Sequence, residues 1–292
     1  MDESRQAIIA KALEIKRELK AATVIPCARF TLSTEECGIF DSKIGGLPYF
    51  PEGAPVPCDR DGHALYLLAQ INCEDIAELP DFPHKGMLQF FISDDDLYGS
   101  TLTVPSPQDD WRVVYYPEID PATDPALAEE VFSKGLEREL CPFEGEYRMN
   151  FTLDEEGISV WDCRFEALFI GRWNEAYPDE EPIDSLYDLD DDVYECIWDE
   201  TDRDEVEDFG DDDRKTMPLM HKMGGYPFFT QEDPRDGETC GDYDTLLFQL
   251  DSQGSGGVDV MWGDLGIGNF FISREKLKAL DFSDVLYNWD CY

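Results

Sequence analysis

The 292-residue chain has few histidines, few basic residues and no long apolar run. Its three histidines, His63, His84 and His221, show no paired spacing of the kind that binds a transition metal. The longest apolar stretches, such as Leu65 to Ala69, fall far short of the roughly 20 residues that span a bilayer. The acidic N-terminus also lacks the basic and apolar segments of a secretory leader. We therefore expect no metal site, no membrane span and a cytoplasmic location.

The cysteines show no arrangement that predicts a disulfide framework or a zinc site. There are nine, an odd number, and no Cys-x-x-Cys pair occurs. Their positions are Cys27, Cys37, Cys58, Cys73, Cys141, Cys163, Cys196, Cys240 and Cys291. Scattered cysteines of this kind are typical of reduced thiols in a reducing compartment, so we expect nine free thiols.

Positive charge is also scarce, since 66 acidic residues face 23 basic ones and the formal net charge is −43. Such a field repels phosphate backbones and anionic lipid surfaces. Nucleic acid and membranes are therefore not expected as partners. A cation or a basic protein surface is the expected partner. The hydrophobic fraction of 42% nevertheless indicates a folded protein.

One eight-residue pattern occurs twice, as KIGGLPYF at 43–50 and KMGGYPFF at 222–229. The same offset aligns LLAQIN at 67–72 with LLFQLD at 246–251, and one residue later FFIS at 90–93 with FFIS at 270–273. Identities kept in order at one offset indicate an internal duplication. We expect an N-terminal helix at 1–23, repeat one at 24–110, intervening strands, a helix and an acidic segment at 111–204, and repeat two at 205–292, all in one compact structural unit.

The local patterns predict a mainly β fold with an α+β margin. The Gly-Gly-x-Pro segments are typical of turns, and the Leu-Leu-x-Gln and Phe-Phe-Ile runs of buried strands. Further strands are expected at 151–153, 159–161 and 167–170. The expected helices are few: an amphipathic one over residues 1–19, one beginning at Asp124-Pro125 and one capped by Ser273. The architecture is then an internally duplicated β-sheet or roll with a few peripheral helices.

These segments resemble the YwqG-like family, a group of bacterial proteins described as a domain of unknown function. The resemblance rests on SKIGGLP at 42–48, LLAQIN at 67–72, GMLQFF at 86–91, HKMGGYP at 221–227, LLFQLD at 246–251 and WGDLG at 262–266. It implies a mainly β, duplicated fold, and it brings no known activity, cofactor or catalytic residue. The acidic segment 179–213 departs from the family's core.

The first candidate ligand site is the repeated Lys-x-Gly-Gly motif with its strand glutamine. The residues are Lys43, Gly45, Gly46, Gln70, Lys222, Gly224, Gly225 and Gln249. A glycine-rich turn beside a lysine can bind an anion through its backbone N–H groups. The structural alternative is that each buried glutamine amide is satisfied by backbone groups of the adjoining turn, and the pairing of buried polar groups favours it.

The second candidate is the segment WGDLG at 262–266. Asp264 between glycines, next to an exposed Trp262, would line a ligand pocket. Turn chemistry favours the alternative of a turn that leads into the next strand.

No catalytic, metal or cofactor site is predicted. There is no Gly-x-Ser-x-Gly elbow and no cysteine in a catalytic sequence pattern. Asp188, Asp190, Asp192 and Glu195 alternate, but the glycine and the terminal glutamate of an EF-hand are missing.

The favoured function is that of a non-catalytic binding or protein-interaction module with an acidic surface, such as an inhibitor or immunity protein. Its acidic segment, residues 179–213, has nineteen acids and one base, and Leu186, Val193 and Ile197 recur in it at helical spacing. This segment is either a solvated linker or a helix that attracts a basic protein. The alternative function is a hydrolase or small-ligand-binding protein with a pocket between the two repeats. The ligand, the partner and the oligomeric state stay open.

Overall fold

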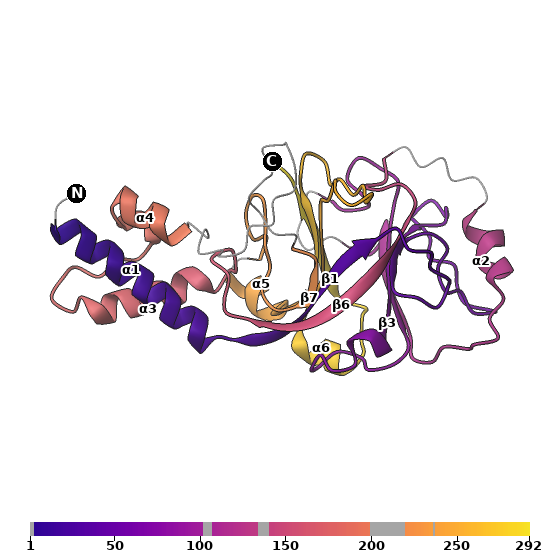
Figure 1. Cartoon of the computed structure of the whole chain (residues 1–292), viewed down its shortest axis with the longest axis horizontal. Coiled ribbons are helices and arrows are strands. Elements are labelled where there is room, and N and C mark those ends of the chain that lie inside the picture. Colours follow the sequence, from indigo (N-terminus) through magenta and orange to yellow (C-terminus); the bar gives the residue numbers. More distant parts are fainter. Residues whose placement is uncertain (1–2, 102–106, 134–139, 199–219, 236) are drawn as a thin grey trace. The chain divides into compact units, whose positions relative to one another are not determined.

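The computed structural model describes the chain except for residues 1–2, 102–106, 134–139, 199–219 and 236 (Figure 1). The chain divides into two compact units. The helical unit comprises Met1–Ile25, Glu155–Pro218 and Gly225–Phe228, and the sheet unit comprises Pro26–Asp154, Leu219–Gly224 and Phe229–Tyr292. The boundaries expected from the repeats do not coincide with these units, because each unit combines stretches that are distant in sequence.

A single ten-stranded antiparallel sheet dominates the fold, which confirms the mainly β prediction. Its strands are β1 (Ile25–Ser33), β2 (Lys43–Gly45), β3 (Tyr66–Asn72), β4 (Met87–Ile92), β5 (Trp111–Tyr116), β6 (Glu146–Glu156), β7 (Lys222–Gly224), β8 (Thr245–Asp251), β9 (Ile267–Ile272) and β10 (Val285–Asp290). Their order across the sheet is β10-β9-β8-β7-β1-β6-β2-β3-β4-β5.

This strand order has a twofold pattern. The strands of the two halves correspond in sequence order, β1 with β6, β2 with β7 and so on to β5 with β10. When each strand is replaced by its counterpart, the order across the sheet is the same read from the opposite edge. The registers agree, because Lys43 of β2 lies opposite Arg148 of β6, and Lys222 of β7 lies opposite Arg29 of β1. The first strand of each half therefore pairs with the second strand of the other half: β1 pairs with β7, and β6 pairs with β2.

The core of the sheet unit joins the two halves through aromatic rings. Phe90 of β4 lies 4.8 Å from Phe248 of β8 and 4.9 Å from Phe270 of β9, measured between ring centroids. All three side chains are fully buried. Each aromatic contact of this kind stabilises the fold by about 0.5–1.5 kcal/mol beyond the free energy gained from burying the ring surface. The two halves of the sheet unit thus share one core.

Three helices and a short 3₁₀ turn, η2 (Leu186–Asp188), build the described part of the helical unit. The helices are α1 (Glu3–Ala22), α3 (Phe165–Ala176) and α4 (Asp191–Trp198). Their buried apolar side chains form one cluster, to which α1 contributes Ile15, α3 Phe169 and α4 Ile197. In the part of the chain that the structure describes, no helix is both long and apolar enough to cross a membrane.

The remaining short helices belong to the sheet unit. They are η1 (Cys73–Ile76), α2 (Pro125–Phe132), α5 (Gly237–Asp242) and α6 (Arg274–Lys278). The predicted caps of α2 and α6 are confirmed. Asp124 accepts a hydrogen bond from the N–H of Ala126 at 3.0 Å, and the Ser273 hydroxyl accepts one from the N–H of Lys276 at 3.2 Å. Both satisfy N–H groups that a helix leaves unpaired.

Two of the predicted strands are wrong. Residues 167–170 lie inside α3, and residues 159–161 form a turn before it. Phe165, Phe169 and Trp173 repeat every four residues and are all buried, which is the pattern of one helix face. A short apolar run fits a strand and a buried helix equally well, and here only the spacing of the residues on either side of it distinguishes the two.

The prediction of nine free thiols is wrong at two positions. Cys163 and Cys240 are disulfide-bonded, whereas the other seven cysteines are free. Neither Cys163 nor Cys240 lies in a recognisable spacing pattern, so the sequence offered no basis for singling them out.

Candidate functional site

The two Gly-Gly turns have the same unusual backbone conformation. Gly45 and Gly46 have φ angles of 69° and 70°, and Gly224 and Gly225 have 67° and 68°. Two successive left-handed residues are strained for any side chain other than glycine. A Cβ atom on Gly46 would also lie 1.8 Å from Oε2 of Glu146. The motif therefore requires glycine for structural reasons alone.

Gln70 holds both flanks of the first turn. Its Oε1 accepts hydrogen bonds from the N–H of Tyr49 at 2.6 Å and from Nε2 of Gln89 at 2.8 Å. Its Nε2 donates to the carbonyls of Ile39 and Asp41, both at 2.9 Å. The amide is completely buried and fully satisfied, which confirms the structural alternative for this glutamine.

Gln249 has the corresponding place in the second half. It lies opposite Lys222, as Gln70 lies opposite Lys43, and its Nε2 donates to the carbonyl of Met220, just before the second turn. The structural alternative is confirmed here as well.

The anion-binding alternative fails because internal carboxylates occupy both turns. Lys43 is 1% exposed and its Nζ lies 2.8 Å from Oε2 of Glu146, at the first residue of β6. In the helical unit, the N–H of Tyr226 donates to Oε1 of Glu156, the last residue of β6, at 2.6 Å. These acids already take the positions that an external anion would need.

Lys43 and Lys222 do not converge on a pocket between the repeats. Two strands, β1 and β6, separate β2 from β7 in the sheet. Three strand spacings amount to about 14 Å. Asp264, the charged residue of the second candidate site, lies in an exposed turn. The two lysines thus lack the short mutual distance that a shared catalytic site needs.

Trp262 is a core residue, so the expectation of an exposed tryptophan is wrong. Its ring is fully buried and packs edge-on against Tyr98, with 5.2 Å between the centroids. The N–H of Gly266 donates to the carbonyl of Trp262 at 2.8 Å, and Leu265 adopts a positive φ of 60°. This segment is therefore the predicted turn, and Asp264 contributes a backbone carbonyl that accepts from Tyr292.

His221 is buried and has a structural role. Its Nδ1 accepts from the N–H of Asp251 at 3.0 Å, so its Nε2 carries the proton and donates to Oε1 of Gln253 at 3.0 Å. The ring stacks on Phe30 with 5.3 Å between the centroids. Burial lowers the pKa of His221 to about 4. Among the described residues no histidine is hydrogen-bonded to a serine or cysteine, as a nucleophilic pair would require.

Cys37 is unsuited to nucleophilic chemistry. Burial, and then a hydrogen bond to Glu146, raise the pKa of its thiol to about 12. Catalytic cysteines have a lowered pKa, because the thiolate is the nucleophile. Cys37 therefore stays protonated near neutral pH.

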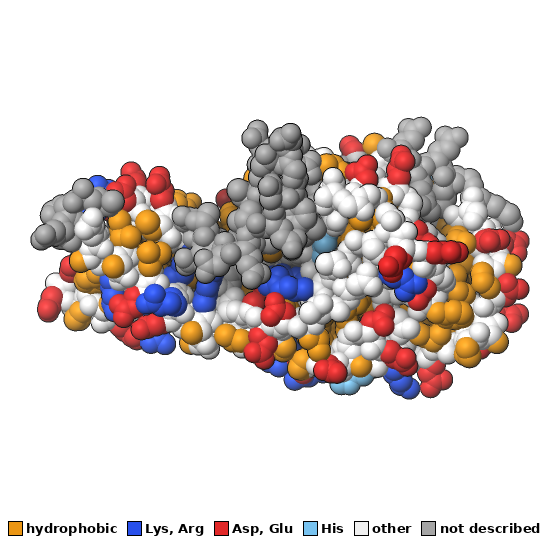
Figure 2. All heavy atoms as spheres, viewed as in Figure 1, with side chains coloured by type: hydrophobic (Ala, Val, Ile, Leu, Met, Phe, Trp, Pro, Cys, Tyr) orange, Lys and Arg blue, Asp and Glu red, His pale blue; other side chains and the backbone are white. Residues whose placement is uncertain are grey.

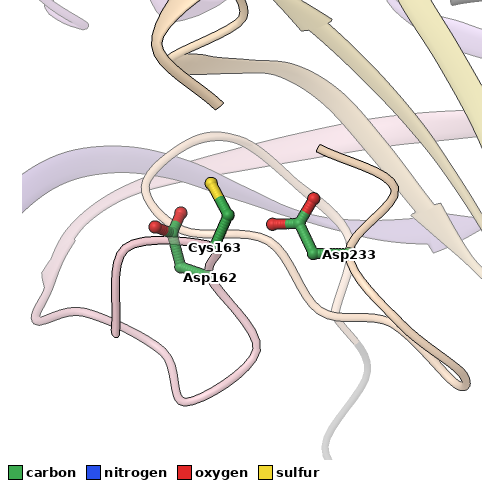
Figure 3. Close-up of side chains that lie close together, drawn as sticks. All are labelled: Asp162, Cys163 and Asp233. Carbon is green, nitrogen blue, oxygen red and sulfur yellow. The ribbon is translucent and has the colours of Figure 1, made fainter. Parts of the chain in front are cut away.

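Two Asp-x-Arg pairs repeat the same local geometry. Asp162 accepts from Nε and Nη2 of Arg164 at 2.6 and 2.7 Å, and Asp233 accepts from the same atoms of Arg235 at 2.9 and 2.6 Å. Figure 3 shows both carboxylates together with Cys163. Both oxygens of each carboxylate bind an arginine, and the Cys163 sulfur is in a disulfide rather than a thiolate. We therefore assign no metal site to these residues.

Three of the four alternating acids, Asp188, Asp190 and Asp192, are engaged within the helical unit, whereas Glu195 is exposed. Asp188 accepts from the N–H groups of Asp184 and Ser185, both at 3.0 Å, and so caps η2. Arg5 pairs with Asp190 and, at 2.9 Å, with Asp192. These three carboxylates bind groups of the helical unit.

One polar cleft of about 290 Å³ opens in the sheet unit beside β6. It is lined by Phe40, Asp41, Asn72, Asp75, Arg148, Met149, Asn150 and Phe151. Arg148 binds Asp41 through two parallel hydrogen bonds, of 3.2 and 3.0 Å. Burial acts to raise the pKa of Asp41, but the N–H of Gly38 and the Arg148 guanidinium outweigh it and lower that pKa. No sequence pattern marks these residues, because they come together only in the folded sheet.

The model of one protein family matches residues 42–291, which is most of the chain. The chain belongs to the DUF1963 family. That family is described as a domain of unknown function, so membership brings no catalytic residue to this DUF1963 protein. No curated protein matches the chain. The candidate site therefore depends on its geometry alone.

Replacing Gln70 with leucine should lower the free energy of unfolding by about 1–3 kcal/mol, because buried backbone groups beside the turn lose their partners. Chemical denaturation measures this change. The control is Gln6→Leu at an exposed position of α1, for which a change within about 0.5 kcal/mol is expected. An unchanged denaturation midpoint for Gln70→Leu would contradict the structural role.

The low pKa of His221 predicts a pH-dependent stability. Between pH 6.5 and about 4 the unfolded chain binds a proton that the buried ring does not, so the free energy of unfolding falls as the pH falls through this range. The loss from this residue is about 3 kcal/mol. His221→Asn keeps an acceptor for the N–H of Asp251 but does not titrate. The stability difference between wild type and variant should therefore shrink from pH 7 to pH 4, and a constant difference would refute the assignment.

Proposed function

We propose that this protein binds a basic protein without catalysing a reaction, and that it does so through an acidic and aromatic surface of the helical unit. The observation that carries this proposal is the position of Tyr187, whose side chain is 80% exposed. Its ring stacks on Tyr194 of α4, with 5.1 Å between the centroids and 23° between the planes. Large exposed aromatic side chains are characteristic anchors of protein interfaces.

Acidic residues lie close to this aromatic pair in the sequence. We call Tyr187, Tyr194, Asp191 and Glu195 the α4 face; Asp191 and Glu195 are exposed and lie on the same helix as Tyr194. An aromatic ring beside carboxylates suits a lysine or arginine, because the ring attracts a cation and the acids add Coulomb attraction. Figure 2 shows acidic side chains exposed on both units, which agrees with a net charge of −43.

The α4 face is fixed to the fold. Val193 and Ile197 are buried on the inner side of α4, and α1 packs against this helix. The interpretation as a solvated linker does not hold for residues 186–198, which form η2 and α4 with buried apolar side chains, but the expected helix with one apolar edge covers only Asp191–Trp198. The rest of the acidic segment, from residue 199, lies outside the described residues. A surface that is rigid before binding loses less entropy on association.

The duplication is also part of the proposal, together with a YwqG-like assignment within the family and a cytoplasmic location. Equivalent hydrogen bonds support a common origin of the two halves. Ser42 accepts from the N–H of Met149 through its carbonyl and from that of Asn72 through its hydroxyl, at 3.0 and 2.9 Å. His221 accepts from the N–H of Phe30 through its carbonyl at 3.2 Å and from the N–H of Asp251 through its side-chain Nδ1 at 3.0 Å.

Neutralising the α4 face should slow association with the partner. The partner is captured from a lysate of the protein's own cells at low salt, released at high salt and purified. For Asp191→Asn combined with Glu195→Gln, we expect an association rate several-fold lower at low salt and a weaker salt dependence. The charge-matched control, Glu52→Gln with Glu129→Gln, alters exposed acids of the sheet unit and should keep the wild-type rate. Equal rates for the two variants would contradict the proposal.

Removing the exposed ring should accelerate dissociation. Tyr187→Ala deletes a side chain that contributes little to the folded core, so the melting temperature should stay near that of the wild type. If Tyr187 anchors the partner, the dissociation rate should rise about 10-fold or more, the effect of an interface residue worth over 1.4 kcal/mol. Biolayer interferometry measures the rate. An unchanged dissociation rate would remove Tyr187 from the interface.

A further inference from the structure

The cleft beside β6 has two charged groups that neutralise each other. Arg148 and Asp41 form the bidentate pair described above, and Nη2 of Arg148 also donates to the carbonyl of Glu36 at 2.9 Å. A guanidinium paired with a carboxylate in this way has its charge already compensated. This pair therefore gives the cleft little attraction for an external anion.

The third charged group, Asp75, is oriented by a chain of hydrogen bonds. The N–H of Asn72 donates to Oγ of Ser42 at 2.9 Å, and that hydroxyl donates to Oδ2 of Asp75 at 2.6 Å. In the described part of the chain, no hydrogen bond is made to the other oxygen, Oδ1. The cleft thus has a net charge of about −1 and an acceptor that is held in place and exposed to solvent.

The remaining lining suits an aliphatic stem that ends in a cation. Phe40 and Phe151 contribute aromatic surface, and both rings are fixed by neighbours, Phe151 by Phe30 at 5.3 Å and Phe40 by Tyr49 at 5.9 Å. Asn150 is exposed and adds a second oxygen acceptor. Lysine and arginine place their methylene stems on apolar surface and their charged ends on acceptors. A cleft of about 290 Å³ lies at the small end of ligand sites, as expected for a single side chain.

The second half of the sheet lacks this set, although its backbone is equivalent. At the positions that correspond to Asp41 and Ser42 it has Met220 and the buried His221, and its arginine, Arg29, pairs instead with Asp154 at 2.8 Å. The polar lining is therefore not a requirement of the fold.

We infer that the cleft formed by Asp75, Asn150, Phe40 and Phe151 receives a lysine or arginine side chain. The inference depends on the proposed function only for where that side chain comes from, namely the basic partner protein. The two claims concern different units of the chain and can fail separately.

The test uses Nα-acetyl-arginine amide and Nα-acetyl-lysine amide as probes, added to the full-length ¹⁵N-labelled protein and followed by NMR. Saturable shifts are expected at the side-chain amides of Asn72 and Asn150 and along residues 148–151. Nα-acetyl-citrulline amide has nearly the shape of the arginine probe without its charge, and it should bind at least 10-fold more weakly. Acetate serves as the anionic probe. Binding of acetate at Arg148, or equal binding of the citrulline probe, would overturn the inference.

Two variants and a control locate the binding. Asp75→Asn keeps an oxygen that can accept from Ser42 but removes the charge, and it should weaken binding of the arginine probe at least 10-fold. Asn150→Ala changes an exposed side chain and should weaken it a few-fold. Glu74→Gln removes the same charge from the neighbouring residue outside the cleft and should leave binding unchanged. Equal effects of Asp75→Asn and Glu74→Gln would show general screening and refute the site. Wild-type partner binding by the α4-face variants, together with intact probe binding in the cleft, would refute only the proposed function.

Discussion

The fold depends on a buried amide beside a left-handed glycine pair. An unpaired amide in the interior is costly, so Gln70 must find partners, and it finds them on both sides of the Gly45-Gly46 turn and on the neighbouring strand. These bonds fix where β2 lies on β3 and keep the preceding loop on the sheet. Gln249 repeats the arrangement, and the acidic ends of β6 fill the two turns.

Much of the sheet could be predicted because its determinants are local. Runs such as residues 67–72 and 90–93, each followed by a recognisable turn or cap, specify strands without knowledge of their partners. The segment 167–170 could not be assigned in the same way, because only Phe165 and Trp173 on either side of it reveal the helical period. The exchange of β1 and β6 between the halves was not predictable either, since strand partners depend on contacts across the whole sheet.

Among the candidate sites, too, the features set by neighbouring residues could be predicted, and those set by residues distant in sequence could not. The satisfied glutamines could be predicted, because a polar residue in an apolar strand must bind nearby backbone. Trp262 was misjudged since glycines around a tryptophan indicate a turn but not its burial. The Arg148–Asp41 pair joins residues 107 positions apart, and only the register of β6 with β2 brings them together. Non-local pairs of this kind are invisible to pattern analysis.

We propose that partner recognition uses the α4 face of the helical unit. Hydrogen–deuterium exchange of the protein with and without its captured partner tests this claim most directly, because it maps the interface without any substitution. If the α4 face binds the partner, exchange should slow in residues 186–198 on binding and stay unchanged in β9 and β10 at one edge of the sheet. Protection confined to the sheet edges, with residues 186–198 unchanged, would contradict it.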